Sequence, residues 1–114
     1  MKNEQIFNKP QNIPPSIIAW AESLKDRAGI YATTYQEQNI YLIAAGLCPS
    51  GGYHIVITSG VEPDTVYYQV NDPAPDDFVI QILTYPYELL FTKQKLRFFN
   101  HNCKHFIEPQ FVKL

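Results

Sequence analysis

The stretch GIYATTYQEQNIYLIAA, residues 29–45, decides the fold class of this chain. Residues 30–35 and 40–45 are rich in β-branched and aromatic side chains, which favour strands, and the polar residues 36–39 between them predict a turn. The second segment is apolar on both faces, with Ile40, Leu42 and Ala44 on one side and Tyr41, Ile43 and Ala45 on the other. A strand of this kind lies in the middle of a sheet, with a covering layer on each side.

An amphipathic helix is expected before this stretch. Pro14 and Pro15 suit a first helical turn, and Gly29 suits the position after the last one. Apolar residues recur between them with the helical period: Ile17, Trp20, Ala21 and Leu24. The spacing predicts a helix over residues 15–28 whose apolar face covers the sheet.

The rest of the chain predicts short strands separated by Pro, Gly and Asp residues. The strands and short apolar runs cover residues 53–59, 65–71, 78–83, 85–91 and 96–99. Turn signals recur about every 8–12 residues, as in sandwiches and barrels, and the absence of alternating strands and helices argues against a parallel sheet. We therefore expect a mainly β, β-rich α+β fold: an antiparallel sandwich or partial barrel of about six to seven short strands, with one N-terminal helix packed on it.

The length and composition indicate one ordinary domain. The chain has 114 residues, of which 46% are hydrophobic and 14% aromatic, and this length is close to the commonest domain size. We expect residues 1–13 to form a flexible arm and residues 14–114 a single β-rich domain. Residues 106–114 are predicted to form a tail that Phe111 and Val112 anchor to the domain.

The charge balance excludes several classes of partner. Lys and Arg number 9 and Asp and Glu number 11, so the net charge is −2, and no basic excess is present to neutralise a nucleic acid. No apolar run approaches the roughly 18 residues of a transmembrane segment. Residues 1–10 lack the apolar core of an export signal, so we expect a cytoplasmic protein, or an exported or cell-surface one if a leader has been removed.

His101, Cys103 and His105 are the strongest candidates for metal or thiol chemistry. On a strand they would share one face, and imidazole and thiolate are zinc ligands. The local sequence supplies no fourth ligand, which would have to come from Cys48, His54 or a carboxylate. No helix N-terminus is expected near Cys103 to lower its pKa. We therefore predict no metal, no cofactor and no catalytic residue, and keep these three residues as weak metal candidates.

Asp72, Asp76 and Asp77 form an acidic, proline-containing loop. Paired carboxylates can perform acid–base chemistry when their environments separate their pKa values. Calcium loops carry denser oxygen ligands at fixed spacing. A solvated turn is the favoured interpretation of this loop.

A motif that begins with glycines, here called the glycine-containing motif, is spread over residues 46–87. Gly46 and the run Ser50-Gly51-Gly52-Tyr53 come first, then a loop with Pro73 and Pro75, and finally Gln81 and Thr84-Tyr85-Pro86-Tyr87. The two adjacent glycines predict a tight corner, with Tyr53 packed over it. The order of these residues resembles the C-terminal domain of PrcB-type protease-complex subunits, over about residues 38–99.

The resemblance implies a small β-rich domain without known catalysis. The namesake of the family is an accessory subunit that supports assembly of a cell-surface subtilisin-like protease. The resemblance supplies no catalytic residues, only the motif positions Gly46, Ser50, Gly51, Gly52, Tyr53, Gln81, Thr84 and Pro86.

Three functional hypotheses follow. The favoured one is a non-catalytic domain that binds another protein and assists the assembly or stability of a protease or other complex, and an exposed aromatic patch would support it. The first alternative is a small-ligand or glycan-binding module that uses Tyr67, Tyr68, Tyr85 and Tyr87 as flat platforms, which a concave pocket would support. The second is a metal- or thiol-dependent enzyme built on His101, Cys103 and His105.

Overall fold

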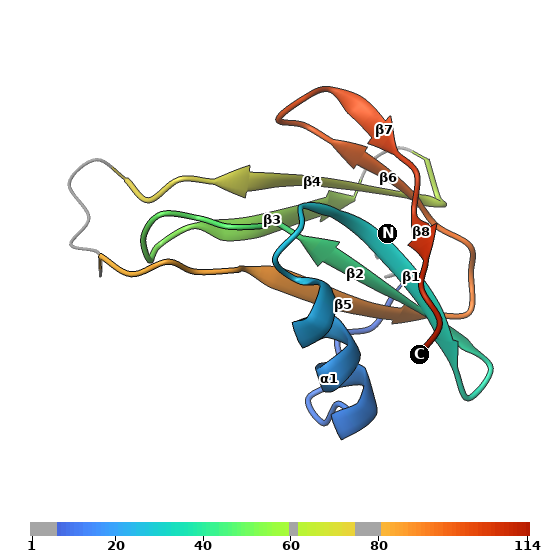
Figure 1. Ribbon diagram of the computed structural model, residues 1–114. Coiled ribbons are helices and arrows are strands. Elements are labelled where there is room, and N and C mark those ends of the chain that lie inside the picture. The colour runs from blue at the N-terminus through green and yellow to red at the C-terminus, as the bar shows by residue number, and fades with distance from the viewer. Residues whose placement is uncertain (1–6, 60–61, 75–80) are drawn as a thin grey trace.

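A computed structural model describes residues 7–59, 62–74 and 81–114 of the chain. These residues form three layers, in which α1 covers one four-stranded sheet and that sheet packs on a second one (Figure 1). The elements are α1 (Pro15–Leu24), β1 (Gly29–Tyr35), β2 (Gln38–Ala44), β3 (His54–Ser59), β4 (Thr65–Asn71), β5 (Tyr87–Thr92), β6 (Arg97–Asn100), β7 (His105–Ile107) and β8 (Gln110–Phe111). The predicted β-rich α+β sandwich with one N-terminal helix is confirmed.

The first sheet has the strand order β5-β2-β1-β8, and β2 lies near its centre. Every residue from Ile40 to Ala44 is buried, as the two-faced apolar pattern predicts. β1 and β2 form an antiparallel hairpin whose turn residues, Gln36 and Glu37, have φ angles of 49° and 66°. Positive φ at both positions is the geometry of a type I′ turn, whose twist matches that of the flanking strands.

The helix packs on the outer face of this sheet, as predicted. Ile17, Trp20 and Ala21 are buried against it and Leu24 is partly buried beside them. The helix ends at Leu24 rather than at residue 28, so its predicted C-terminal end is wrong. Residues 26–28 are exposed, and a further helical turn there would bury little apolar surface. Gly29 therefore begins β1 instead of following the helix.

The two sheets enclose a second apolar cluster. Ile43 and Leu90 from the first sheet and Val66 and Phe98 from the second are almost fully buried in it. The ring of Tyr41 lies 5.0 Å from that of Phe98, centroid to centroid. β2 therefore has a layer on each of its faces: α1 on one and the second sheet on the other.

The second sheet has the order β3-β4-β6-β7 and, like the first, it is mixed. Four strand pairs are antiparallel, as expected: β1–β2, β2–β5, β3–β4 and β6–β7. The β1–β8 and β4–β6 pairs are parallel. A parallel pair requires a crossover connection. Between β4 and β6 the chain passes through the first sheet as β5, and the described residues of this connection contain no helix.

Two segments differ from their predicted form. Residues 81–83 of the predicted run over 78–83 are not part of a strand, and residues 78–80 lie outside the described chain. The expected tail, residues 106–114, contains β8 and most of β7. These strands form because β8 pairs with β1 in the first sheet and β7 pairs with β6 in the second. Val112 packs on the apolar cluster between α1 and the first sheet, here called the helix-side cluster. The other expected anchor, Phe111, is 63% exposed.

The side of the sandwich at β5 is covered by the segment that precedes the helix. Asn8 and Phe91 exchange two backbone hydrogen bonds of 2.7 and 2.9 Å, and Phe7 packs into the cluster between the sheets. The division into an arm over residues 1–13 and a domain over 14–114 stays a prediction. In the described chain, no helix is long and apolar enough to cross a membrane.

Candidate functional site

The glycine-containing motif forms a corner at one end of the first sheet. Cys48 and Thr84 exchange backbone hydrogen bonds of 2.8 and 2.9 Å, and the N–H of Ala45 donates to the carbonyl of Pro86 at 3.0 Å. The Thr84 hydroxyl donates to the carbonyl of Ser50, 34 positions away in the sequence, at 2.8 Å. The fold thus brings the two halves of the motif together.

Two glycines of the motif have backbone angles that favour glycine. Gly46 has a φ of 78° and Gly52 one of 89°, whereas Gly51 is not in this region. A Cβ atom on Gly46 would lie 3.0 Å from the backbone nitrogen of Ala28 and 3.2 Å from its Cβ. Tyr53 is only partly buried and belongs to neither core cluster, so its packing over the corner stays a prediction. Gln81 is exposed.

His101, Cys103 and His105 do not share one face of a strand. The first two lie in the turn over residues 101–104, and His105 begins β7. The turn is held in place by Asn102, whose side chain bonds the backbone of Val70 twice, at 2.8 and 3.2 Å. Among the described residues, no group of three or more His, Cys, Asp and Glu side chains is arranged to hold a metal ion.

The buried cysteine, Cys48, does not have the surroundings of an activated thiol. Burial raises the pKa of the Cys48 thiol, and the negative charge of Asp72 raises it further, so the reactive thiolate is disfavoured. Cys103 is exposed in the turn. Asp72 is exposed, and Asp76 and Asp77, the other carboxylates of the predicted acidic loop, lie outside the described residues.

The tyrosines predicted as a flat platform lie in three separate places. Tyr68 is buried between the sheets, where desolvation raises its pKa. Tyr85 and Tyr87 lie near α1, and the Tyr87 hydroxyl donates to Glu22 at 3.1 Å. Burial, followed by the interaction with Glu22, raises the pKa of Tyr87. Only Tyr67 lies on the outer face of the second sheet, so the four do not form one surface.

That outer face carries a group of aromatic side chains in contact, here called the aromatic row: Tyr67, Phe99, Phe106 and His101. The strand register places Tyr67 opposite Phe99 and Phe99 opposite Phe106. Their ring centroids are 5.6 and 5.1 Å apart, and the His101 ring stacks on Tyr67 at 5.7 Å. At the end of the row, the Arg97 guanidinium lies 4.2 Å from the centre of the Phe106 ring.

The aromatic row faces outward. The helix of the described chain covers the other sheet, and Phe106 is 49% exposed. Sequence reasoning identified Tyr67 as a surface ring but missed Phe99 and Phe106. The residues are ordinary strand formers, and only the parallel pairing of β4 with β6 brings them next to Tyr67.

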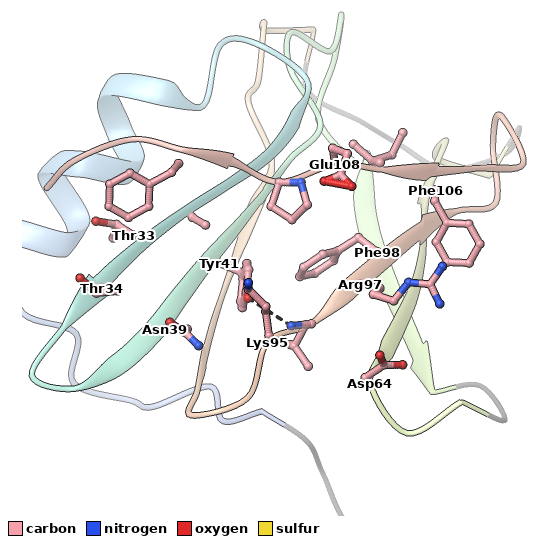
Figure 2. Close-up of a pocket in the computed structure, with 15 residues that line it drawn as sticks. Thr33, Thr34, Asn39, Tyr41, Asp64, Lys95, Arg97, Phe98, Phe106 and Glu108 are labelled. Atoms are coloured by element: carbon pink, nitrogen blue, oxygen red, sulfur yellow. Dashed lines mark hydrogen bonds between the residues drawn. The ribbon is translucent and has the colours of Figure 1, made fainter.

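A cleft of about 680 Å³ opens on the side of the sandwich opposite β5. Figure 2 shows it between the β1–β2 hairpin, with Thr34 and Asn39, and β6, with Arg97 and Phe98. Glu108, in the segment that joins β7 to β8, lies across one end of the cleft.

The interior of the cleft is apolar and its rim is charged. Tyr41, Leu96 and Phe98 are buried at its base, where the Leu96 N–H donates to the Tyr41 hydroxyl at 3.1 Å. Two largely exposed rings, Phe106 and Phe111, also line it. The charged lining residues are Asp64, Lys95, Arg97 and Glu108. The cleft therefore shares Phe106 and Arg97 with the outer surface.

Residues 40–93 match the family model described as PrcB C-terminal, which confirms the resemblance. The match runs from β2 to β5 and contains the whole glycine-containing corner. It ends before β6, β7 and β8, which supply part of the cleft lining and two residues of the aromatic row, Phe99 and Phe106. No curated protein and no solved structure matches the chain.

Proposed function

We propose that this chain is a non-catalytic domain that binds another protein in a protease-associated complex, with the aromatic row as its contact surface. The PrcB C-terminal match supports the protease-complex context. Within the matched segment, Thr84 bonds to the backbone of Cys48 and Ser50, and the carbonyl of Pro86 accepts from Ala45. Gly46 lies where an added Cβ would meet the backbone of Ala28. These motif residues build the corner, so we look for the contact surface elsewhere.

The observation that carries the proposal is the outer face of the second sheet, which no helix or strand of the described residues covers. Tyr67, Phe99 and Phe106 form a contiguous aromatic surface there, with Arg97 stacked on its end. Contiguous exposed apolar surface on a small protein marks an interaction site. Aromatic and Arg side chains are the residues that most often dominate binding energy at protein interfaces.

The test is affinity capture from the source cells with three forms of the chain. The wild type is compared with a Tyr67→Ala/Phe106→Ala double variant and with a Tyr85→Ala control, which removes a ring near α1 instead. We expect the double variant to lose at least about tenfold of the captured partner, as for interface anchor residues, and the control to retain it.

Thermal melts of the three forms establish that each one is folded. Equal capture by the folded double variant would refute the aromatic row as the contact surface. Quantitative mass spectrometry of the captured proteins also tests the protease-complex part of the proposal. A protease or a component of a protease complex must be among the proteins whose capture depends on the aromatic row.

A small-ligand or glycan-binding module is the second candidate, and the volume of the cleft favours it. At about 680 Å³ the cleft is as large as ordinary ligand pockets, which measure roughly 300–1,000 Å³. A glycan array and a thermal-shift screen with metabolites separate the two functions. A saturable small-molecule ligand of the wild type, lost in a variant of the exposed cleft ring, Phe111→Ala, and kept in Tyr67→Ala, would favour this alternative.

A further inference from the structure

The edge of β1 is only partly paired. β8 lies beside Tyr31 and Ala32, and the last hydrogen bond between the strands runs from the Val112 N–H to the Ala32 carbonyl at 2.9 Å. Alternate residues of a strand direct both backbone groups to the same side, so Thr34 directs its N–H and carbonyl to the same side as Ala32. In the described chain, no group pairs with the Thr34 backbone on that side.

The Trp20–Val112 contact explains why β8 stops before Thr34. If β8 continued in its register, the carbonyl of Val112 would accept the N–H of Thr34. That carbonyl instead accepts the indole N–H of Trp20 at 3.0 Å, and the chain leaves β1 toward the helix. An unpaired donor and acceptor thus remain at an exposed residue that lines the cleft.

The surroundings of this edge suit an extended chain with apolar side chains. A strand added beside β1 would direct every second side chain into the cleft. There it would lie above the buried base and meet the exposed rings of Phe106 and Phe111. Main-chain hydrogen bonds to an open sheet edge, with pockets for alternate side chains, are a general mode of peptide recognition.

One charged residue of the cleft is free to meet a carboxylate. Arg97 is paired with Glu62 at 3.7 Å and stacked on Phe106. Lys95 is exposed and has no ion pair among the described residues. Asp64 and Glu108 also line the cleft, so the four lining charges sum to zero and disfavour a highly charged ligand.

From these observations we propose that the cleft binds an extended peptide segment of the partner protein. The segment pairs with the backbone of Thr34, places alternate apolar side chains against Phe106 and Phe111, and presents one carboxylate to Lys95. This inference rests on the proposed function, and it names the kind of partner segment that the domain holds. The carboxylate belongs to an Asp or Glu side chain or to a chain terminus.

The first test uses a phage-displayed library of random peptides, selected on the wild-type chain. We expect the selected peptides to alternate apolar residues and to carry one acidic residue or a required free C-terminus. Synthetic versions with free and amidated C-termini identify the source of the carboxylate. Selection of no peptide above the background of an unrelated immobilised protein would overturn the inference.

The second test examines the β1 edge with a matched pair of variants. Thr34→Pro removes the outward N–H, and proline is tolerated where the N–H of an edge strand faces solvent. Thr34→Ala removes the same side chain but keeps the N–H. We expect about tenfold weaker binding for Thr34→Pro than for Thr34→Ala, as for the loss of one backbone hydrogen bond. Equal affinity of the two folded variants contradicts pairing at this edge.

Hydrogen exchange of the wild-type chain supplies a readout that needs no variant. The Thr34 amide should exchange fast in the free protein and become protected when the selected peptide saturates the cleft. An unprotected Thr34 amide in the complex would show that the peptide binds elsewhere. This result decides the question even if Thr34→Pro does not fold.

The third test concerns the charge, with Lys95→Gln compared with Lys93→Gln. Lys93 is also exposed but does not line the cleft. We expect Lys95→Gln alone to weaken the peptide, with a loss that disappears at high salt; equal losses for both variants would contradict the assignment. If no peptide binds while partner capture still depends on Tyr67 and Phe106, this inference fails and the proposed function stands. If no peptide binds and partner capture does not depend on Tyr67 and Phe106, both the inference and the proposed function are refuted.

Discussion

Gly46 passes so close to the start of β1 that a side chain has no room there. Its φ of 78° favours glycine, and an added Cβ would approach the backbone of Ala28 to 3.0 Å. We expect Gly46→Ala to lower the free energy of unfolding by roughly 1–3 kcal/mol, the usual cost of such backbone strain. Gly51→Ala is the matched control, because Gly51 does not have a positive φ. Urea unfolding of both variants makes the comparison, and an equal loss would contradict the role given to Gly46.

Because Tyr68 is buried, we expect the free energy of unfolding to fall in alkaline solution. Desolvation raises the pKa of its phenol above the usual 10.0, against an opposing effect of the hydrogen bond from Asn100. The folded state therefore favours the neutral phenol, and this contribution is complete below about pH 10 and is lost as the pH rises through the higher folded pKa. Tyr68→Phe should flatten the fall in unfolding free energy measured between about pH 9 and 12. An unchanged slope would mean that Tyr68 does not cause it.

At the scale of elements, Trp20 connects α1 with β8. Its ring is 6% exposed and its indole N–H donates to the carbonyl of Val112. Trp20→Ala should cost on the order of 3–5 kcal/mol, as for other large buried aromatics, and a loss below about 1 kcal/mol in denaturant melts would show that the helix is not docked.

Trp20→Phe separates the hydrogen bond from the packing. It keeps an aromatic ring against the sheet and removes the donor to Val112, together with a few buried ring atoms of the larger indole. We expect a smaller stability loss, with faster amide exchange at Val112 because β8 is less firmly held. Unchanged exchange at Val112 would argue that β8 is positioned by its pairing with β1 alone.

At the scale of the whole molecule, the two core clusters share one sheet. β1, β2 and β5 present one face to α1 and the other to the second sheet. Phe98 is 0% exposed in the cluster between the two sheets, and Trp20 lies in the helix-side cluster, so its fluorescence follows the unfolding of that cluster. Phe98→Ala should cost about 3–5 kcal/mol and should shift the unfolding seen by Trp20 fluorescence together with that seen by circular dichroism. Separate transitions would show that the layers unfold independently.

The sequence by itself determined the local elements and their faces. The helical spacing from Ile17 to Leu24 correctly places the face of α1 that meets the sheet. The two-faced apolar run from Ile40 to Ala44 correctly places β2 between two layers. These patterns can be interpreted because a helix and a strand each repeat their side-chain directions over a few residues. The motif from Gly46 to Pro86 also identified the family segment correctly.

Only the tertiary structure decided where the candidate binding surfaces lie. The pairing of β4 with β6 brings Tyr67 next to Phe99, and the pairing of β1 with residues 110–111 leaves Thr34 at an open edge. His101 and Cys103 would share a face with His105 only on a continuous strand, but the chain turns at residues 101–104 to form β7 beside β6. The choice of partner and register between distant strands depends on packing across the whole domain, and the local alternation of side chains does not encode it.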